Sequence, residues 1–253
     1  MPVKKKERTD KLLLERGIVA SREKAKALIM AGQVIVNDRR VDKAAEMVPV
    51  DSDIRIKGEQ LPFVSRGGLK LEHAIKHFNI DPAGKTAVDV GASTGGFTDC
   101  LLQRGAAKVY AVDVGYGQMD LKVKNDARVV PIERTNIREM DRDNIPEEVD
   151  IAVIDVSFIS LIKVLPHVIP LLKKGGEIAA LIKPQFEVGK GEVGKGGIVR
   201  DDGKVERVLE EVRKFAEASG LEVAGLTPSP ILGAKGNREF LIYLINQNQA
   251  KIT

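Results

Sequence analysis

The sequence contains no tryptophan, and only 4% of its 253 residues are aromatic. A nucleic-acid surface built mainly from stacked aromatic rings is therefore not expected. The single cysteine, Cys100, excludes an internal disulfide. No run of about 18 apolar residues suggests a membrane-spanning helix, and the basic amino terminus lacks the apolar segment of a secretory signal. These absences predict a cytoplasmic protein.

Positive charge is concentrated near the amino terminus. The net charge is +4, and residues 1–60 hold 14 basic against 10 acidic residues, so the remainder of the chain is balanced. An electropositive segment is typical of proteins that contact phosphate backbones. Apolar residues make up 43%, enough for a substantial core. The length suits one large domain joined to a small one.

The most informative stretch runs from Ala87 to Asp99. A short apolar strand leads into a glycine-rich turn, and a helix over 97–104 follows. Glycine lets a backbone approach a ligand closely, and the start of a helix offers free N–H groups. A second strand, 109–112, ends in Asp113, about 20 residues after the turn, where an acid can bind ribose hydroxyls. The pattern predicts one half of a nucleotide-binding fold.

The glycine spacing differs from the dinucleotide pattern Gly-x-Gly-x-x-Gly, so no pyrophosphate is expected. A nucleoside without pyrophosphate, such as S-adenosylmethionine, suits it better. An ordinary tight turn between strand and helix is the alternative. The residues expected to bind this cofactor are Asp89, Gly91, Ala92, Ser93, Thr94, Gly95, Gly96, Phe97, Asp113, Asn136 and Asp155.

From Thr86 onward, strands alternate with helices, which predicts an α/β fold with a Rossmann-like, doubly wound parallel sheet. Ligands bind beyond the carboxyl ends of the strands in such sheets, so Asp113, Asn136 and Asp155 should share one rim. Further strands are expected at 127–132, 149–154, 177–182, 221–228 and 239–245. Helices are expected at 67–78, with Ser65 as its cap, at 161–172 and at 201–219.

A glycine-rich loop over 185–198 contains Gly189-Lys-Gly-Glu-Val-Gly-Lys195. It resembles a phosphate-binding P-loop incompletely, because no Ser or Thr follows the lysine. We expect a mobile flap over the site instead.

Residues 1–7 are expected to form a disordered basic tail, followed by a small α+β domain over residues 8–57. Two short helices, the second over 22–31 with Ser21 as its N-cap, precede strands at 33–37 and 53–56. The segments Ser21-Arg22-Glu23-Lys24-Ala25 and Gly32-Gln33-Val34-Ile35-Val36-Asn37 resemble the core signature of the S4 RNA-binding domain. A protein-binding module of the same fold is the alternative.

The S4 resemblance implies contacts with structured RNA, which needs basic side chains more than aromatic ones. Residues 58–64 are expected to be an interdomain linker, and residues 65–253 the catalytic domain. The candidate RNA-binding residues are Arg8, Arg22, Lys24, Lys26, Arg39, Arg40 and, at the start of the second domain, Arg66.

Two lysines and two acids complete the candidate site. Asp155 and Lys183 stand at strand ends, Lys70 lies near the start of a helix, and Glu239 opens the last strand. A lysine buried beside another cation, which Lys70 could supply, loses its proton more readily and can act as a general base. It could take the proton of a ribose 2′-hydroxyl while the oxygen attacks a methyl group in line.

No metal is expected. His73 and His77 have the i, i+4 spacing of a metal-binding pair, but no acidic or cysteine partner accompanies them. We expect them to be a surface or packing pair.

The set Lys70, Asp155, Lys183 and Glu239 resembles the Lys-Asp-Lys-Glu tetrad of the FtsJ/RrmJ-like ribose 2′-O-methyltransferases. With the S4-like domain in front, residues 8–246 resemble the TlyA family. The motifs that carry this likeness are Ser65-Arg66-Gly67-Gly68-Leu69-Lys70, Asp89-Val-Gly-Ala-Ser-Thr-Gly-Gly-Phe-Thr98 and Ile182-Lys183-Pro184-Gln185-Phe186-Glu187.

The resemblance implies an S-adenosylmethionine-dependent rRNA cytidine 2′-O-methyltransferase that acts on ribosomal subunits, with the four tetrad residues catalytic. Neither a membrane nor an obligate protein partner is expected from the sequence. It also implies that residues 58–64 couple RNA binding to cofactor binding.

Three other functions remain open at this stage. Family members often carry the name hemolysin, but no insertion segment of convincing length is present in the sequence. An RNA-binding protein without catalysis is disfavoured because all four tetrad positions are filled. A nicotinamide-dependent oxidoreductase is disfavoured by the glycine spacing.

Overall fold

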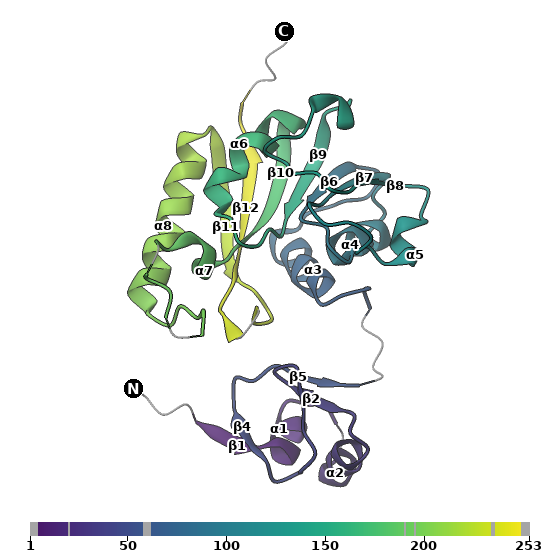
Figure 1. The fold of residues 1–253 in the computed structure, drawn as a ribbon, viewed down its shortest axis with the longest axis vertical. Coiled ribbons are helices and arrows are strands. Elements are labelled where there is room, and N and C mark those ends of the chain that lie inside the picture. Colours follow the sequence, from purple (N-terminus) through teal and green to yellow (C-terminus); the bar gives the residue numbers. More distant parts are fainter. Residues whose placement is uncertain are drawn as a thin grey trace. The chain divides into compact units, whose positions relative to one another are not determined.

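The computed structural model describes residues 5–19, 21–57, 62–189, 191–194, 196–233 and 236–248. The chain divides into two compact units, Met1–Gln60 and Leu61–Thr253, which we describe one at a time (Figure 1). Residues 58–61 of the expected linker lie outside the described part. No helix among the described residues is long and apolar enough to cross a membrane.

The first unit is a small α+β fold. Its helices are packed on short strands around a core that contains Leu13, Ile29 and Val34. Strand β2 pairs antiparallel with both β3 and β5, and β1 pairs antiparallel with β4. The elements are β1 (Lys6–Arg8), α1 (Thr9–Glu15), α2 (Arg22–Met30), β2 (Val34–Val36), β3 (Arg39–Arg40), β4 (Met47–Pro49) and β5 (Ile54–Ile56).

Lys6 and Glu7 differ from the sequence prediction, which placed them in a disordered tail. Their backbone pairs with Met47–Pro49, a strand that the sequence did not indicate, and this pairing orders the chain from residue 6. The predicted cap of α2 is confirmed, since the Ser21 hydroxyl accepts a hydrogen bond from Lys24 N at 3.2 Å.

The second unit is built on a seven-stranded sheet of order β11-β12-β10-β9-β6-β7-β8. The five strands from β10 to β8 are parallel, whereas β12 runs antiparallel between β10 and β11. This confirms the predicted doubly wound fold. The strands are β6 (Thr86–Val90), β7 (Lys108–Val112), β8 (Val129–Ile132), β9 (Val149–Ile154), β10 (Leu172–Ile182), β11 (Leu221–Pro228) and β12 (Phe240–Asn246).

Helices cover both faces of this sheet (Figure 1). One core joins α3 and α4 to alternate strand residues such as Val109 and Ile151, and the other joins α6 and α8 to their neighbours, such as Tyr110 and Ala152. Because both faces of these strands are buried, their sequences are nearly continuous runs of apolar residues. The helices are α3 (Gly67–Phe78), α4 (Gly96–Gln103), α5 (Leu121–Lys124), α6 (Leu165–Val168), α7 (Pro184–Glu187) and α8 (Asp202–Ala218), with 3₁₀ turns at Arg142–Asn144, Leu161–Lys163 and Ile169–Leu171.

The helix predicted over 161–172 is wrong in detail. Pro166 and Pro170 break it into two 3₁₀ turns and the single turn α6, because proline lacks an N–H and disturbs the helix interior. The predicted Ser65 cap of α3 is also wrong. The N-cap is Arg66 without a side-chain bond, and only the Ser65 carbonyl accepts from Gly68 N.

Candidate active site

Four charged side chains from distant parts of the second unit meet at the carboxyl ends of β9 and β10. Asp155 and Lys183 follow these strands, Lys70 lies in the first turn of α3, and Glu239 directly precedes β12. Lys183 Nζ lies 2.5 Å from Asp155 Oδ1, and Lys70 Nζ lies 2.5 Å from Glu239 Oε2. Lys70 Nζ is also 4.0 Å from Asp155 Oδ2. The structure therefore brings all four predicted tetrad residues into one cluster.

The charges of this cluster alternate in the order Glu239, Lys70, Asp155, Lys183. The sequence suggested Lys70 as the cation that neighbours Lys183, and the structure places the Asp155 carboxylate between the two ammonium groups. Both lysines are almost fully buried, and buried charges need such partners. The Lys183–Asp155 contact is an ion pair without hydrogen-bond alignment, and Lys183 Nζ donates a hydrogen bond to Ser157 Oγ at 3.0 Å.

Glu239 lies against the backbone of Gly233. A Cβ at position 233 would overlap the Glu239 carboxylate. Gly233 N donates to Asn237 O at 2.8 Å, which closes the turn in front of β12. The missing side chain at this turn therefore makes room for the acid that holds Lys70.

A pocket of about 480 Å³ opens beside the cluster, within the size range of small-molecule sites. Asp155 and Ser157 line it and so connect it with Lys183. Five of the residues predicted to bind a cofactor line this pocket: Gly91, Ser93, Asp113, Asn136 and Asp155.

Asp113 is anchored by the backbone around it. Its Oδ2 accepts a hydrogen bond from Ser93 N at 2.8 Å, and its Oδ1 accepts one from Gly115 N at 2.6 Å. A carboxylate oxygen can accept more than one hydrogen bond. The anchored group therefore keeps the capacity to accept bonds from ribose hydroxyls.

Apolar side chains, among them Val112, Ile137 and Ile159, form much of the remaining wall. Such a wall fits a flat purine ring, so the pocket as a whole fits an adenosine-type ligand. The sequence analysis did not assign a binding role to the lining residues Val114, Gln118, Ile137, Arg138, Ser157, Phe158, Ile159 and Val164. All of them except Val164 follow Asp113, Asn136 or Asp155 by no more than about five residues, and this position is the signal that could have found them.

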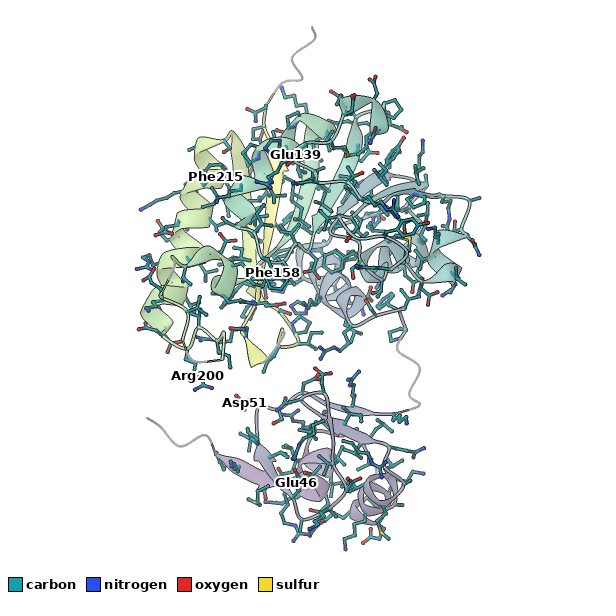
Figure 2. All side chains as sticks on the ribbon, viewed as in Figure 1. Glu46, Asp51, Glu139, Phe158, Arg200 and Phe215 are labelled. Carbon is teal, nitrogen blue, oxygen red and sulfur yellow. The ribbon has the colours of Figure 1, made fainter. Side chains whose placement is uncertain are left out.

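Phe158, labelled in Figure 2, lines this pocket although 90% of its surface is exposed. Its backbone has a φ of 63°, which non-glycine residues rarely adopt. The ring packs against Phe186 with a centroid distance of 5.0 Å. Glu187 holds the same turn from α7, since it accepts hydrogen bonds from Ser160 Oγ at 2.6 Å and Leu161 N at 2.7 Å.

Six residues of the predicted cofactor set do not line this pocket. A Cβ at Gly96 would overlap Ser65 Oγ, and one at Gly95 would lie 3.1 Å from Val123. At these two positions the absence of a Cβ allows close packing within the protein. The six are Asp89, Ala92, Thr94, Gly95, Gly96 and Phe97, of which all but Thr94 are buried.

The predicted RNA-binding residues fall in both units. Arg40 forms an exposed ion pair with Asp42 at 2.5 Å, and Arg39 pairs with Glu46. Such exposed pairs leave the guanidinium groups accessible to another partner. Arg8, Arg22, Lys24, Lys26, Arg39 and Arg40 belong to the first unit, whereas Arg66 is the N-cap of α3 in the second.

The loop predicted as a mobile flap is tied to its neighbours. Glu192 accepts hydrogen bonds from Arg207 of α8 at 2.8 Å, and Asn237 Nδ2 donates to Gly197 O at 2.9 Å. Lys190 and Lys195 of the incomplete P-loop lie outside the described residues. The described part of this loop is therefore anchored at both sides.

The histidine pair lies on α3. The rings of His73 and His77 stack with a centroid distance of 5.7 Å. In the ranges that the structure describes, no three histidine, cysteine or acidic side chains are grouped so as to hold a metal ion.

Sequence comparison matches residues 63–246 to the FtsJ-like methyltransferase family and residues 7–54 to the S4 domain. The 16S/23S rRNA (cytidine-2′-O)-methyltransferase TlyA of Mycobacterium tuberculosis is 42% identical over 97% of this chain and 92% of the relative. The Bacillus subtilis protein YqxC is 50% identical over 95% of this chain and 86% of the relative.

A solved structure of a hemolysin-like protein from Streptococcus thermophilus superimposes with a TM-score of 0.76. It is 45% identical, and the match covers 98% of this chain and 90% of that one. The two family matches and the relatives of nearly full length thus indicate the same family. The chain belongs to the TlyA family, whose members join an S4 domain to an FtsJ-like methyltransferase domain.

Proposed function

We propose that this protein methylates the ribose 2′-hydroxyl of a cytidine in ribosomal RNA, acting on ribosomal subunits with S-adenosylmethionine as methyl donor. The Mycobacterium tuberculosis relative carries this activity in its name. The observation that carries the proposal here is the convergence of Lys70, Asp155, Lys183 and Glu239 next to a pocket of nucleoside size.

Asp113 would hold the ribose of the cofactor, and the apolar wall would hold its purine ring. S-adenosylmethionine supplies an electrophilic methyl group on a positively charged sulfur. Asp155 and Ser157 line the same pocket and contact Lys183, so the methyl acceptor belongs at their end of it.

Lys183 is the candidate general base, since its amine in the neutral form can take the proton of the 2′-hydroxyl. Asp155 and Ser157 fix the position of its Nζ, and the Lys70–Glu239 pair balances the charge of Asp155 from the other side. A positioned base contributes about 10² to 10⁴-fold to the rate. Lys70, Asp155 and Glu239 act as positioning residues around it.

We further propose that the segment ahead of α3 links RNA binding to cofactor binding. Phe63 is buried in the core that includes Phe97 of α4, and Val64 N donates to Asp99 Oδ2 at 2.9 Å. Gln103 Nε2 donates to Pro62 O at 2.8 Å. Because α4 directly follows the turn that lines the pocket, a displacement of this segment would reach the cofactor site.

The test uses S-adenosylmethionine with a tritiated methyl group and separated ribosomal subunits from cells that lack the enzyme. We expect label in ribosomal RNA, and a rate at least about 100-fold lower for Lys183→Ala with cofactor affinity preserved. Lys108→Ala is the matched control, because this lysine begins β7, pairs with Glu147 and does not line the pocket.

Cofactor binding without label in either subunit would overturn the substrate assignment, whereas absence of cofactor binding would overturn the methyltransferase site itself. Equal rates for Lys183→Ala and Lys108→Ala would refute the role of Lys183 and leave the substrate assignment in place.

A further inference from the structure

A single buried carboxylate holds two arginines together in the first unit. Asp10, in the first turn of α1, is fully buried. It accepts hydrogen bonds from Arg8 Nε at 2.9 Å and Arg8 Nη2 at 3.0 Å, and a third from Arg22 Nη2 at 2.9 Å. Both guanidinium groups share Asp10 Oδ2, so they lie next to each other. This cluster is the Arg8–Asp10–Arg22 site.

The site carries one net positive charge. Its two arginine side chains are 40% and 44% exposed, whereas the carboxylate has no exposed surface. The hydrogen bonds from Arg8 and then Arg22 hold the pKa of Asp10 far below its usual range, against the opposing effect of burial. Asp10 is therefore ionised throughout the physiological range, and the positive partners are the groups that a ligand can reach.

The guanidinium groups keep unused donors. A guanidinium carries five N–H groups, and Asp10 occupies Nε and Nη2 of Arg8 but only Nη2 of Arg22. Within the described ranges, no other acceptor is bonded to either guanidinium group. The Nη1 group of Arg8 and the Nε and Nη1 groups of Arg22 are thus available for an acceptor from another molecule.

The backbone around the site is fixed by local structure. Arg8 ends β1, which pairs with β4, and Asp10 N donates to Ala44 O at 3.1 Å. Arg22 begins α2 directly after the Ser21 cap. The guanidinium positions are therefore set before a ligand arrives, which reduces the conformational entropy lost on binding.

We propose that Arg8 and Arg22, held side by side by Asp10, form a preformed binding site for one phosphate group of the RNA backbone. Two adjacent guanidinium groups with N–H donors to spare suit phosphate oxygens in charge and geometry. Asp10 is then a positioning residue for RNA binding. The inference rests on the proposed ribosomal RNA substrate and deepens it.

The substitution Asp10→Asn separates two possible roles of Asp10, because a purely electrostatic role and a positioning role predict opposite changes in RNA affinity. Asp10→Asn removes a negative charge, so simple electrostatics predicts tighter RNA binding. If Asp10 positions the arginines, the variant binds RNA more weakly. The asparagine amide has one neutral acceptor oxygen, whereas the Asp10 carboxylate accepts charge-assisted hydrogen bonds through both of its oxygens. The direction of the change therefore decides between the two.

The experiment measures binding of the full-length protein to the ribosomal subunit that it methylates, over a series of salt concentrations. We expect Asp10→Asn to weaken binding on the order of tenfold and to lower the slope of log K against log salt by about one. Asp38→Asn is the matched control. It removes the same charge from a half-exposed acid that pairs with Arg55, and we expect equal or tighter binding.

Thermal unfolding shows whether Asp10→Asn is folded. A second pair of variants tests the site independently of that result. Arg8→Lys keeps the charge but loses the planar fork, and we expect severalfold weaker binding than for the matched control Arg55→Lys. Unchanged or tighter binding by folded Asp10→Asn, or equal binding by the two lysine variants, would overturn the phosphate site. Wild-type protein that binds neither subunit would overturn the substrate proposal together with it.

Discussion

Asp89 is a fully buried acid, and burial controls when it takes up a proton. Its Oδ2 accepts a hydrogen bond from Thr98 Oγ1 at 2.7 Å, and its Oδ1 has no hydrogen-bond partner within the described residues. Full burial raises its pKa to about 7, and the carboxylates of Asp155 and Asp113 add to the increase. In the unfolded chain the same carboxyl titrates near its ordinary value of about 3.9.

This difference makes the free energy of unfolding depend on pH. Between about pH 4 and 7 the native state holds a proton on Asp89 that the unfolded chain has lost, so stability falls as pH rises through this window and is level above it. The contribution changes by about 1.4 kcal/mol per pH unit, and by at most about 4 kcal/mol in total. We expect Asp89→Asn to lack this slope while keeping an acceptor for Thr98.

Urea unfolding of both proteins from pH 4.5 to 8.5 checks this expectation. Only the difference between them matters, because other acids titrate in both. Parallel curves across the range would show that Asp89 is ionised in the folded protein.

The residues of the glycine turn show what the sequence could and could not predict. Gly91, Ser93 and Asp113 were predicted at the pocket and line it, because the strand ends that place them are marked by short apolar runs. For Gly95 and Gly96 the sequence did not indicate the close packing that the structure shows, in which an added Cβ would meet Val123 or Ser65. A glycine that admits a ligand and one that admits a neighbouring helix are identical in sequence, so tertiary packing alone distinguishes them.

At the scale of elements, the sequence predicted α3, β9 and β11 with the bounds that the structure shows. Their ends coincide with Gly, Pro, Asn or charged residues that stop the apolar pattern. Elements held by contacts distant in sequence were missed or misread. Strand β1 exists through its pairing with β4, and β10 begins at Leu172, with a shift of register before Glu177. Local propensity carries no information about such partners.

The contact between α3 and the segment ahead of it offers a prediction about packing. Gly68, the second residue of α3, lies against Phe63, and a Cβ there would overlap its ring. We expect Gly68→Ala to destabilise the second unit by about 1 to 3 kcal/mol through overpacking. Gly203 holds the corresponding place in α8 without such a neighbour. Gly203→Ala should instead stabilise by up to about 1 kcal/mol, because alanine favours helix.

Chemical denaturation of the two alanine variants measures both effects. Equal changes in the free energy of unfolding would show that the Phe63 side chain can move away from a Cβ at position 68 at little cost. A loss confined to Gly68→Ala would identify the Phe63 packing as a tight, shape-specific contact.

At the scale of the whole molecule, the two units are joined by a chain segment whose far end is built into the catalytic core. Phe63 is 7% exposed and packs among residues of α3 and α4. If this segment links the two functions, ribosomal RNA changes the affinity for S-adenosylmethionine. By thermodynamic reciprocity, the cofactor changes the affinity for RNA by the same factor.

We expect wild-type protein to bind S-adenosylmethionine about tenfold more tightly in the presence of its ribosomal substrate, within the usual range of coupling energies. Phe63→Ala should abolish this gain, because the segment loses its anchor on α4 while the RNA-binding unit is unchanged. Phe215→Ala is the matched control, since this residue of α8 (Figure 2) packs, partly buried, against the core on the other face of the sheet.

Calorimetric titration of the cofactor, with and without ribosomal subunits, gives the coupling for all three proteins. Phe215→Ala should lose stability but retain the coupling. If wild-type affinity is the same with and without RNA, the two units act independently, and Phe63 contributes to stability alone. If Phe63→Ala and Phe215→Ala lose the coupling equally, it depends on the stability of the whole unit rather than on the segment ahead of α3.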